Sequence, residues 1–368
     1  MTTSTPSTPL MRLPKNMQGV TMIELMISLT IGLIIIAGIG YIFLSCRQSF
    51  RNQDALSRMQ EGARAAFEIM DKDIRMAGFK GCPANSAASG DINNLVSATD
   101  WDKNLIDRPL IGYETIPNTL NGVSVYVLRG DALTVLHADN SQEYFVSNTS
   151  SDTPLTLTAN HNIALGAILV VTKADCTRNV IFQNTKNCTL NGTCGIEHAA
   201  NTTCASGNIR TGLGTPIGSC PLGTSDTFPG GRIYRLSAAT YYIGTNSYGE
   251  PALYRQTSST AIPEELIEGV QDMQLLYGID TNADFAIDSY VTADKLTTSA
   301  NWLTVLGIRV SLLMVSRLDE QGITTQPQRY SLDKNGDGDV SDTGETVTPT
   351  DTLLRKMFTT TIAVKNRL

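Results

Sequence analysis

The chain has 368 residues, of which 41% are hydrophobic and 17% are charged, and its formal net charge is −7. This length is enough to bury a sizeable core without help from disulfides. The 28 lysines and arginines are scattered along the chain, which lacks the basic footprint that follows a phosphate backbone, so we expect no nucleic acid as a direct partner. Plentiful Thr, Ser, Asn and Gly favour an extracytoplasmic, β-rich protein.

Residues 1–19 form a short cationic segment with Arg12, Lys15, three prolines and no acid. Such a tail stays in the cytoplasm by the positive-inside rule. Residues 25–44 carry no charge, and a helix of this length spans roughly 30 Å of hydrocarbon. We therefore predict a transmembrane helix over residues 20–44. Two alternatives are a secretory signal peptide, although no small-residue cleavage site follows Leu44, and a lipoprotein acylated at Cys46.

One carboxylate, Glu24, stands at the start of this apolar run, five residues beyond Gly19. An unpaired acid costs roughly 2.5 to 3.5 kcal/mol at the centre of a bilayer and less near its edge, so intramembrane acids usually have a function. Glu24 therefore needs a cationic partner, unless its carboxylate merely reaches the lipid headgroups.

Residues 19–25, with the sequence GVTMIEL, resemble the prepilin processing site that is usually written GFTLIEL. In that family a membrane-embedded prepilin peptidase cuts after the glycine and methylates the new N-terminus. The resemblance implies that residues 1–19 are a leader, that the cut separates Gly19 from Val20, and that Val20 is N-methylated. Val20 and Met22 replace the commoner Phe and Leu, and both are apolar. The new amino group of Val20 would supply the cation for Glu24 of a neighbouring subunit.

Residues 45–78 continue the helix as an amphipathic half that packs on the downstream domain. Apolar residues recur there at three- and four-residue spacing, and Gly78 is placed to end the helix. The apolar positions are Leu56, Met59, Ala63, Ala66, Phe67, Met70, Ile74 and Ala77.

Residues 79–368 are predicted to form a β-rich extracytoplasmic domain. The strands should build an antiparallel sheet, because the chain shows no alternation of strands with helices. Residues 263–270 are predicted as a helical turn with Pro263 near its start. The predicted strands are residues 123–128, 132–137, 167–173, 180–183, 232–243, 252–256, 274–279, 304–316 and 358–365.

Six cysteines follow Cys46, and five of them fall within residues 176–220, which we predict to be a disulfide-rich loop. The chain has no CxxC pair and only His198 lies nearby, so structural disulfides in an oxidising compartment fit better than a zinc site or free thiols. The sequence does not choose among the possible pairings. The candidates are Cys82, Cys176, Cys188, Cys194, Cys204 and Cys220.

Residues 333–341, with the sequence DKNGDGDVS, match the start of an EF-hand-type calcium loop. Position 12 of such a loop should be Glu, but here it is Gly344, and Glu345 comes one residue late. Calcium is therefore a candidate cofactor, and a polar turn is the alternative. The candidate ligands are Asp333, Asn335, Asp337, Asp339 and Glu345, and a weaker copy without the glycine holds Asp280, Asn282, Asp284 and Asp288.

Catalytic motifs are scarce in this chain. It has three histidines and no G-x-S-x-G or Walker motif, so we expect a protein that is not an enzyme.

Further segments at both ends of the chain, but not over residues 84–230, resemble the PilW family of type IV pilus minor pilins. The resemblance implies an α+β, type IV pilin-like fold in which the long N-terminal helix packs on an antiparallel sheet. These segments are residues 73–79 (DIRMAGF), 81–82, 234–243 (YRLSAATYYI), 253–255 (LYR), 268–274, 277–280, 302, 308–310 and 358–367.

The family resemblance also implies a function. Such subunits take part in pilus assembly and initiation, near the pilus tip. The implied partners are the prepilin peptidase, other minor and major pilins, a large tip adhesin and membrane lipid. The chain would be a single-pass protein of the inner membrane, with its C-terminal domain in the periplasm, before it joins the pilus. The alternatives are a minor pseudopilin of a type II secretion system, and a membrane-anchored adhesin or enzyme unrelated to filaments.

Overall fold

The computed structural model describes residues 21–82, 91–97, 100–114, 119–120, 123–124, 129–147, 154–158, 161–187, 195–201, 203–215, 217, 220, 222–258, 262–320, 324 and 326–367. The chain forms two compact units, Met1–Gln53 and Asp54–Leu368. The helix α1 (Met22–Met76) contributes to both. It contains no proline, and Gly78, just beyond its end, has φ +78°, as predicted for the residue that ends the helix.

In the first unit, the apolar part of α1 leaves its side chains exposed from Met22 to Leu44. Within the described residues, α1 is the helix that is long and apolar enough to cross a membrane. An apolar helix surface that no part of its own unit covers requires lipid or a partner around it.

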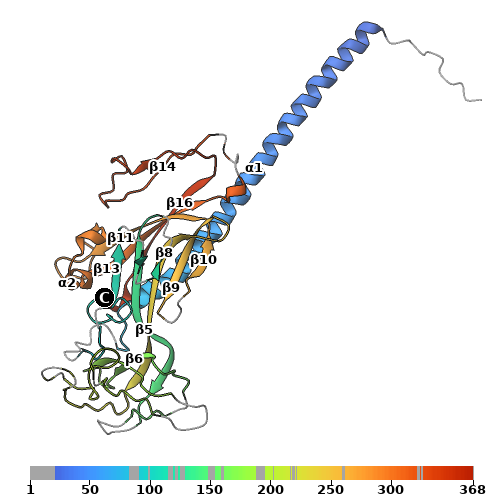
Figure 1. Ribbon diagram of the computed structural model, residues 1–368. Helices are drawn as coiled ribbons and strands as arrows, with labels where there is room; N and C mark the ends of the chain where they lie inside the picture. Colours follow the sequence, from blue (N-terminus) through green and yellow to red (C-terminus); the bar gives the residue numbers. More distant parts are fainter. Residues whose placement is uncertain are drawn as a thin grey trace, which may run out of the picture. The chain divides into compact units, whose positions relative to one another are not determined.

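The second unit contains a large sheet in the order β1-β7-β6-β8-β5-β2, with β9 paired to β8 and β10 paired to β9. Its pairs are antiparallel except for β1 and β7. Strands β5, β8 and β9 run side by side in Figure 1. The strands are β1 (Ile92–Asn93), β2 (Leu110–Tyr113), β5 (Ala132–Phe145), β6 (Ile168–Thr172), β7 (Asn179–Gln183), β8 (Arg232–Thr245), β9 (Pro251–Thr257) and β10 (Glu264–Glu268).

A second, fully antiparallel sheet has the order β12-β11-β13-β16. Its strands are β11 (Val270–Ile279), β12 (Ser289–Val291), β13 (Val305–Val315) and β16 (Arg355–Ala363). Two short hairpins pair β3 (Thr119–Leu120) with β4 (Val123–Ser124) and β14 (Tyr330–Ser331) with β15 (Thr346–Val347). The short helices are η1 (Ala293–Lys295), α2 (Ser299–Leu303), η2 (Leu318–Glu320) and η3 (Lys365–Arg367).

The main core of this unit joins the second half of α1 to both sheets. The buried face of the helix follows the predicted three- and four-residue spacing, with Leu56 and Phe67 half-buried at its edges. Each buried Met or Ile side chain contributes roughly 1.5 to 3 kcal/mol relative to an exposed one, whereas the small alanines allow the helix to lie close to the sheets. The core residues from α1 and the turn that follows it are Met59, Ala63, Ala66, Met70, Ile74 and Ala77.

The predicted strands largely coincide with observed ones, but β5 extends to Phe145, eight residues past its predicted end, and β11 begins at Val270, four residues before its predicted start. Three further differences concern other segments. Residues 264–268 are the edge strand β10 and not a helical turn, because they pair with β9 through a bulge, so the predicted helical turn over residues 263–270 is wrong. Of the strand predicted over residues 123–128, only β4 lies within the described residues. The last strand begins at Arg355, three residues earlier than predicted.

The long loop over residues 184–231 contains no strand among its described residues, as predicted. It nevertheless has its own apolar cluster, in which Ile196, Leu213 and Phe228 are buried against strands β6 and β7. Widely spaced apolar residues therefore help to order this polar loop, beside its disulfides.

Candidate functional site

Helix α1 begins with a capped first turn that contains Glu24. The Thr21 hydroxyl accepts a hydrogen bond from the backbone N–H of Glu24 at 3.3 Å, and the Thr21 carbonyl accepts one from Leu25 at 3.1 Å. The Thr-x-x-Glu spacing is that of a capping box, and an acid in the first turn suits the positive end of the helix dipole. The Glu24 side chain is exposed. Gly19 and Val20 lie outside the described residues.

Near the other end of α1, Asp73 joins the helix to the large sheet. The Tyr241 hydroxyl on β8 donates to Asp73 Oδ2 at 2.6 Å, and His137 Nε2 on β5 lies 3.6 Å from Asp73 Oδ1. Burial raises the pKa of Asp73, but the nearby His137 ring and the hydrogen bond from Tyr241 outweigh it, so the pKa lies below its usual value. A charged carboxylate therefore holds the helix to two strands.

The last turn of α1 is closed by a residue from the C-terminus of the chain. Asn366 in η3 donates from Nδ2 to the carbonyls of Arg75 at 3.4 Å and Met76 at 3.2 Å. The N–H of Gly78 donates to the carbonyl of Leu136 on β5 at 2.9 Å. Helix carbonyls that lack partners within the helix are thus satisfied by a segment 290 positions away.

The chain that leaves the helix runs tightly over the sheet. A Cβ atom at Gly81, which has φ +91°, would lie 2.5 Å from Cε2 of Tyr234, so only glycine fits there. The Phe79 ring packs edge-on against Tyr234 at 5.8 Å between ring centres. Thr172 on β6 donates from its hydroxyl to the Lys80 carbonyl at 2.6 Å.

Two disulfides are present among the described residues. Cys82, directly after the helix exit, is joined to Cys176 between β6 and β7, with the Cα atoms 5.9 Å apart and 94 positions between them in sequence. A second disulfide joins Cys204 to Cys220 over 16 positions. Cys188 and Cys194 lie outside the described residues, and Cys46 is a free, exposed thiol.

Comparison with known families adds two matches. Residues 14–40 match the model of the prokaryotic N-terminal methylation motif, and residues 240–366 match that of PilW, the type IV pilus-assembly protein W. Both matches cover parts of the chain and support a type IV pilus-related pilin. These matches confirm the predicted resemblance to the PilW family and to prepilins. No curated protein and no solved structure matches the chain.

In this pilin, the PilW match ends at the residue that caps α1, Asn366. The segments of the sequence that resemble the family lie far apart, yet Asp73, Tyr241 and Asn366 come together where the helix meets the sheet. The apolar helix and the prepilin motif indicate that the pilin is anchored in a membrane. The residues of these family-like segments thus form a structural site, where the β domain holds the C-terminal end of α1.

The predicted calcium ligands of this pilin all lie in the loop between β14 and β15. Asn335 donates from Nδ2 to Oδ2 of Asp337 at 2.9 Å and to Oδ2 of Asp342 at 2.8 Å. Asp333 accepts amide N–H groups from within the loop at both of its carboxylate oxygens. Within the described residues, no three His, Cys, Asp or Glu side chains are already gathered in a form that could hold a metal ion.

The pilin also has buried acids that the sequence did not single out. Asp131, before β5, accepts at Oδ2 from the Leu275 N–H at 2.7 Å and so connects the large sheet to β11. Burial, together with the charge of nearby Glu114, raises the pKa of Asp131 well above its usual value. The Tyr277 hydroxyl lies so close to Gly112 that a Cβ there would be 1.9 Å from it. No sequence signal marks Asp131, because its burial depends on a strand 144 positions away.

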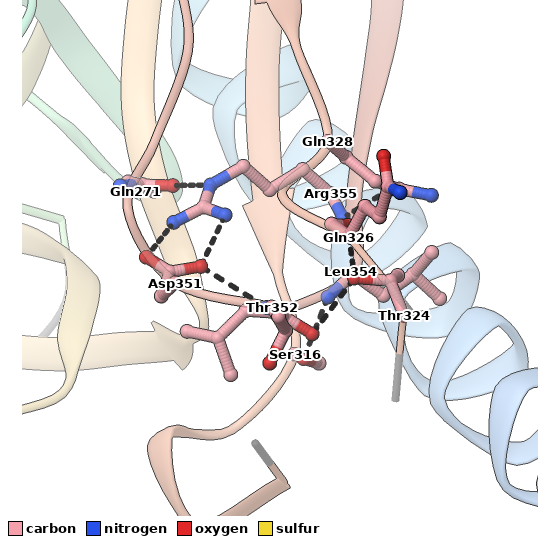
Figure 2. A network of polar contacts seen from close by, with 10 residues as sticks. Gln271, Ser316, Thr324, Gln326, Gln328, Asp351, Thr352, Leu354 and Arg355 are labelled. Atoms are coloured by element: carbon pink, nitrogen blue, oxygen red, sulfur yellow. Dashed lines mark hydrogen bonds and ion pairs between the residues drawn. The ribbon is translucent and has the colours of Figure 1, made fainter. Parts of the chain in front are cut away.

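Figure 2 shows a polar network at the start of β16, centred on Arg355. The guanidinium donates from Nη1 and Nη2 to the two oxygens of Asp351, each at 2.7 Å, and from Nε to Oε1 of Gln271 on β11 at 2.8 Å. The Arg355 side chain is 3% exposed and that of Asp351 is 30% exposed. Thr324 donates from its hydroxyl to the Thr352 carbonyl at 2.9 Å, which ties the preceding segment to the same network.

Proposed function

We propose that this pilin is a minor pilin that takes part in the assembly and initiation of a type IV pilus, near the pilus tip, and that it is not an enzyme. The observation that carries the proposal is Glu24 in the first turn of an exposed apolar helix, directly after a prepilin-type junction. The PilW match over residues 240–366 supports the pilus role over the pseudopilin role.

The proposed pathway begins in the inner membrane, with residues 1–19 in the cytoplasm and the β domain in the periplasm. A prepilin peptidase removes the leader after Gly19 and methylates Val20. The new amino group then pairs with Glu24 of a neighbouring pilin in the apolar layer, where the two charges neutralise each other. The charge pair sets the axial position of each helix, because any other position leaves an acid unpaired in lipid.

The test is the substitution Glu24→Ala in the native host. The Thr21 cap bonds the backbone N–H of Glu24, so the substitution leaves the helix start intact. The matched control is Thr30→Ala, since the Thr30 hydroxyl bonds only the Ile27 carbonyl of its own helix among the described residues. We expect both variants to insert and to be cleaved, and only Glu24→Ala to be depleted from sheared pili.

Wild-type levels of Glu24→Ala in sheared pili would show that the charge pair is dispensable. Deletion of the whole gene separates the two filament roles. The pilus role predicts fewer surface pili with normal protein secretion, whereas the pseudopilin role predicts the reverse.

A further inference from the structure

The acidic loop of the pilin is closed by a short hairpin that fixes which residues face one another. Ser331 on β14 pairs with Thr346 on β15, and the N–H of Leu332 donates to the carbonyl of Glu345 at 2.8 Å. Glu345 therefore lies at the base of the loop, beside Asp333. Because of this register, the Glu345 carboxylate closes the loop although it comes one residue later than the Glu at position 12 of an EF-hand.

Glu345 is the deeply buried acid of this loop, with 3% of its surface exposed. Its Oε1 accepts the N–H groups of Lys334 at 2.8 Å and Asn335 at 3.3 Å, so the carboxylate points into the loop. Its Oε2 is buried and finds no hydrogen-bond partner among the described residues. A buried carboxylate oxygen without a partner is costly, and a cation is the ligand that satisfies it.

Two carboxylates of the loop already accept hydrogen bonds from one neutral donor, the amide of Asn335. The amide nitrogen of Asn335 lies between the carboxylates of Asp337 and Asp342. Lys334, the nearest cation in sequence, donates from Nζ to the Gly344 carbonyl at 3.0 Å and forms no ion pair with these acids among the described residues. A rotation of the Asn335 amide would present its oxygen, in place of its nitrogen, to a metal ion beside the carboxylates of Asp337 and Asp342.

We propose that this loop binds one calcium ion through side-chain oxygens of Asp333, Asn335, Asp337 and Glu345 and the main-chain carbonyl of Asp339. All of these donors are oxygens, of mixed carboxylate, amide and carbonyl type, which calcium accepts in irregular geometry whereas magnesium demands a near-octahedral shell. Gly336 and Gly338 have φ +81° and +85°, which let the backbone wrap around the donors.

A second acidic loop, residues 280–288, serves as an internal comparison. Asn282 there donates to Asp284 at 3.2 Å and to Asp288 at 3.4 Å, as Asn335 does to its own neighbours. The buried acid, Asp280, however accepts amide N–H groups at both carboxylate oxygens, from Ala283 and Phe285. It has no unsatisfied buried oxygen, so we assign no ion to this loop.

The experiment is calorimetric titration of the full-length pilin, in detergent and stripped of metals with EDTA, with calcium chloride. We expect one site with a Kd on the order of 10⁻⁴ to 10⁻³ M, since the bidentate ligand of position 12 is shifted, and no heat with magnesium. Asp337→Asn should weaken binding roughly tenfold or more, because affinity follows ligand charge. Asp284→Asn, the matched change in the comparison loop, should leave it unchanged.

Glu345→Gln is a second variant that keeps the proposal testable if Asp337→Asn does not fold. It should abolish calcium binding and raise the melting temperature in calcium-free buffer, because it neutralises the buried oxygen that lacks a partner. If Glu345 has only a structural role, Glu345→Gln should lower the melting temperature instead. Absence of heat at about 10 mM calcium, or equal losses in the Asp337 and Asp284 variants, would overturn the proposal. The result does not depend on whether the pilin enters a pilus.

Discussion

The Arg355 network makes a quantitative prediction about the stability of the β domain. In Arg355→Met, the pilin loses two charge-assisted hydrogen bonds to Asp351 and one hydrogen bond to Gln271. Removing one partner of a fully buried ion pair costs about 3 to 5 kcal/mol. The Asp351 side chain is 30% exposed and can regain water, so we expect a loss of about 2 to 3 kcal/mol.

The converse change, Asp351→Ala, should cost more than Arg355→Met. The Arg355 side chain is 3% exposed, so its guanidinium cannot regain water when its partner is removed. Lys356→Met is the matched control, because Lys356 is the exposed neighbour on the same strand and should change the free energy of unfolding by less than about 0.5 kcal/mol.

The assay is urea unfolding of the full-length pilin in detergent, followed by the fluorescence of buried Trp302. The hydrogen bond from Arg355 holds the pKa of Asp351 below its usual value. The contribution of this hydrogen bond to folding stability is present above the unfolded pKa of Asp351, about 3.9, and is lost as pH falls through the folded pKa of Asp351. The difference between wild type and Arg355→Met should therefore shrink below about pH 4. Equal stabilities of Arg355→Met and Lys356→Met at pH 7 would refute the reasoning.

Three other substitutions test the remaining contacts. Tyr241→Phe removes the hydrogen bond to Asp73 and should cost about 1.5 to 3 kcal/mol in urea unfolding. Asp131→Asn should stabilise the pilin at pH 7 by roughly 1 to 3 kcal/mol and have no effect near pH 4. The reason is that the raised pKa of Asp131 makes the stability of the wild type fall as pH rises. A stability difference that does not change with pH would contradict this. The double variant Cys82→Ser with Cys176→Ser should cost about 2 to 5 kcal/mol, and an unchanged melting temperature would contradict that expectation.

Elements whose pattern is local could be predicted from the sequence. The buried face of α1 from Met59 to Ile74 follows a 3.6-residue period, and β13 and β16 lie where continuous or alternating apolar residues indicated strands. Residues 264–268 were mistaken for a helical turn because β10 is an exposed edge strand, whose state depends on pairing with β9.

The contacts that form the site could not be predicted, because they join residues distant in sequence. Glu24 and the junction before it were found from a local motif, since an acid at the start of an apolar run is visible in the sequence alone. The bond of Tyr241 to Asp73 spans 168 positions, and that of Asn366 to Met76 spans 290. The sequence contained each of these residues in a family-like segment, but only the fold shows that they meet at the helix exit.

The central claim, that this chain is processed as a prepilin and enters a pilus, is tested most directly at its mature N-terminus. The measurement is mass spectrometry of the N-terminal peptide of the pilin recovered from sheared and purified pili. Our account predicts a chain that begins at N-methylated Val20. A chain that retains Met1, or one that begins at an acylated Cys46, would contradict it.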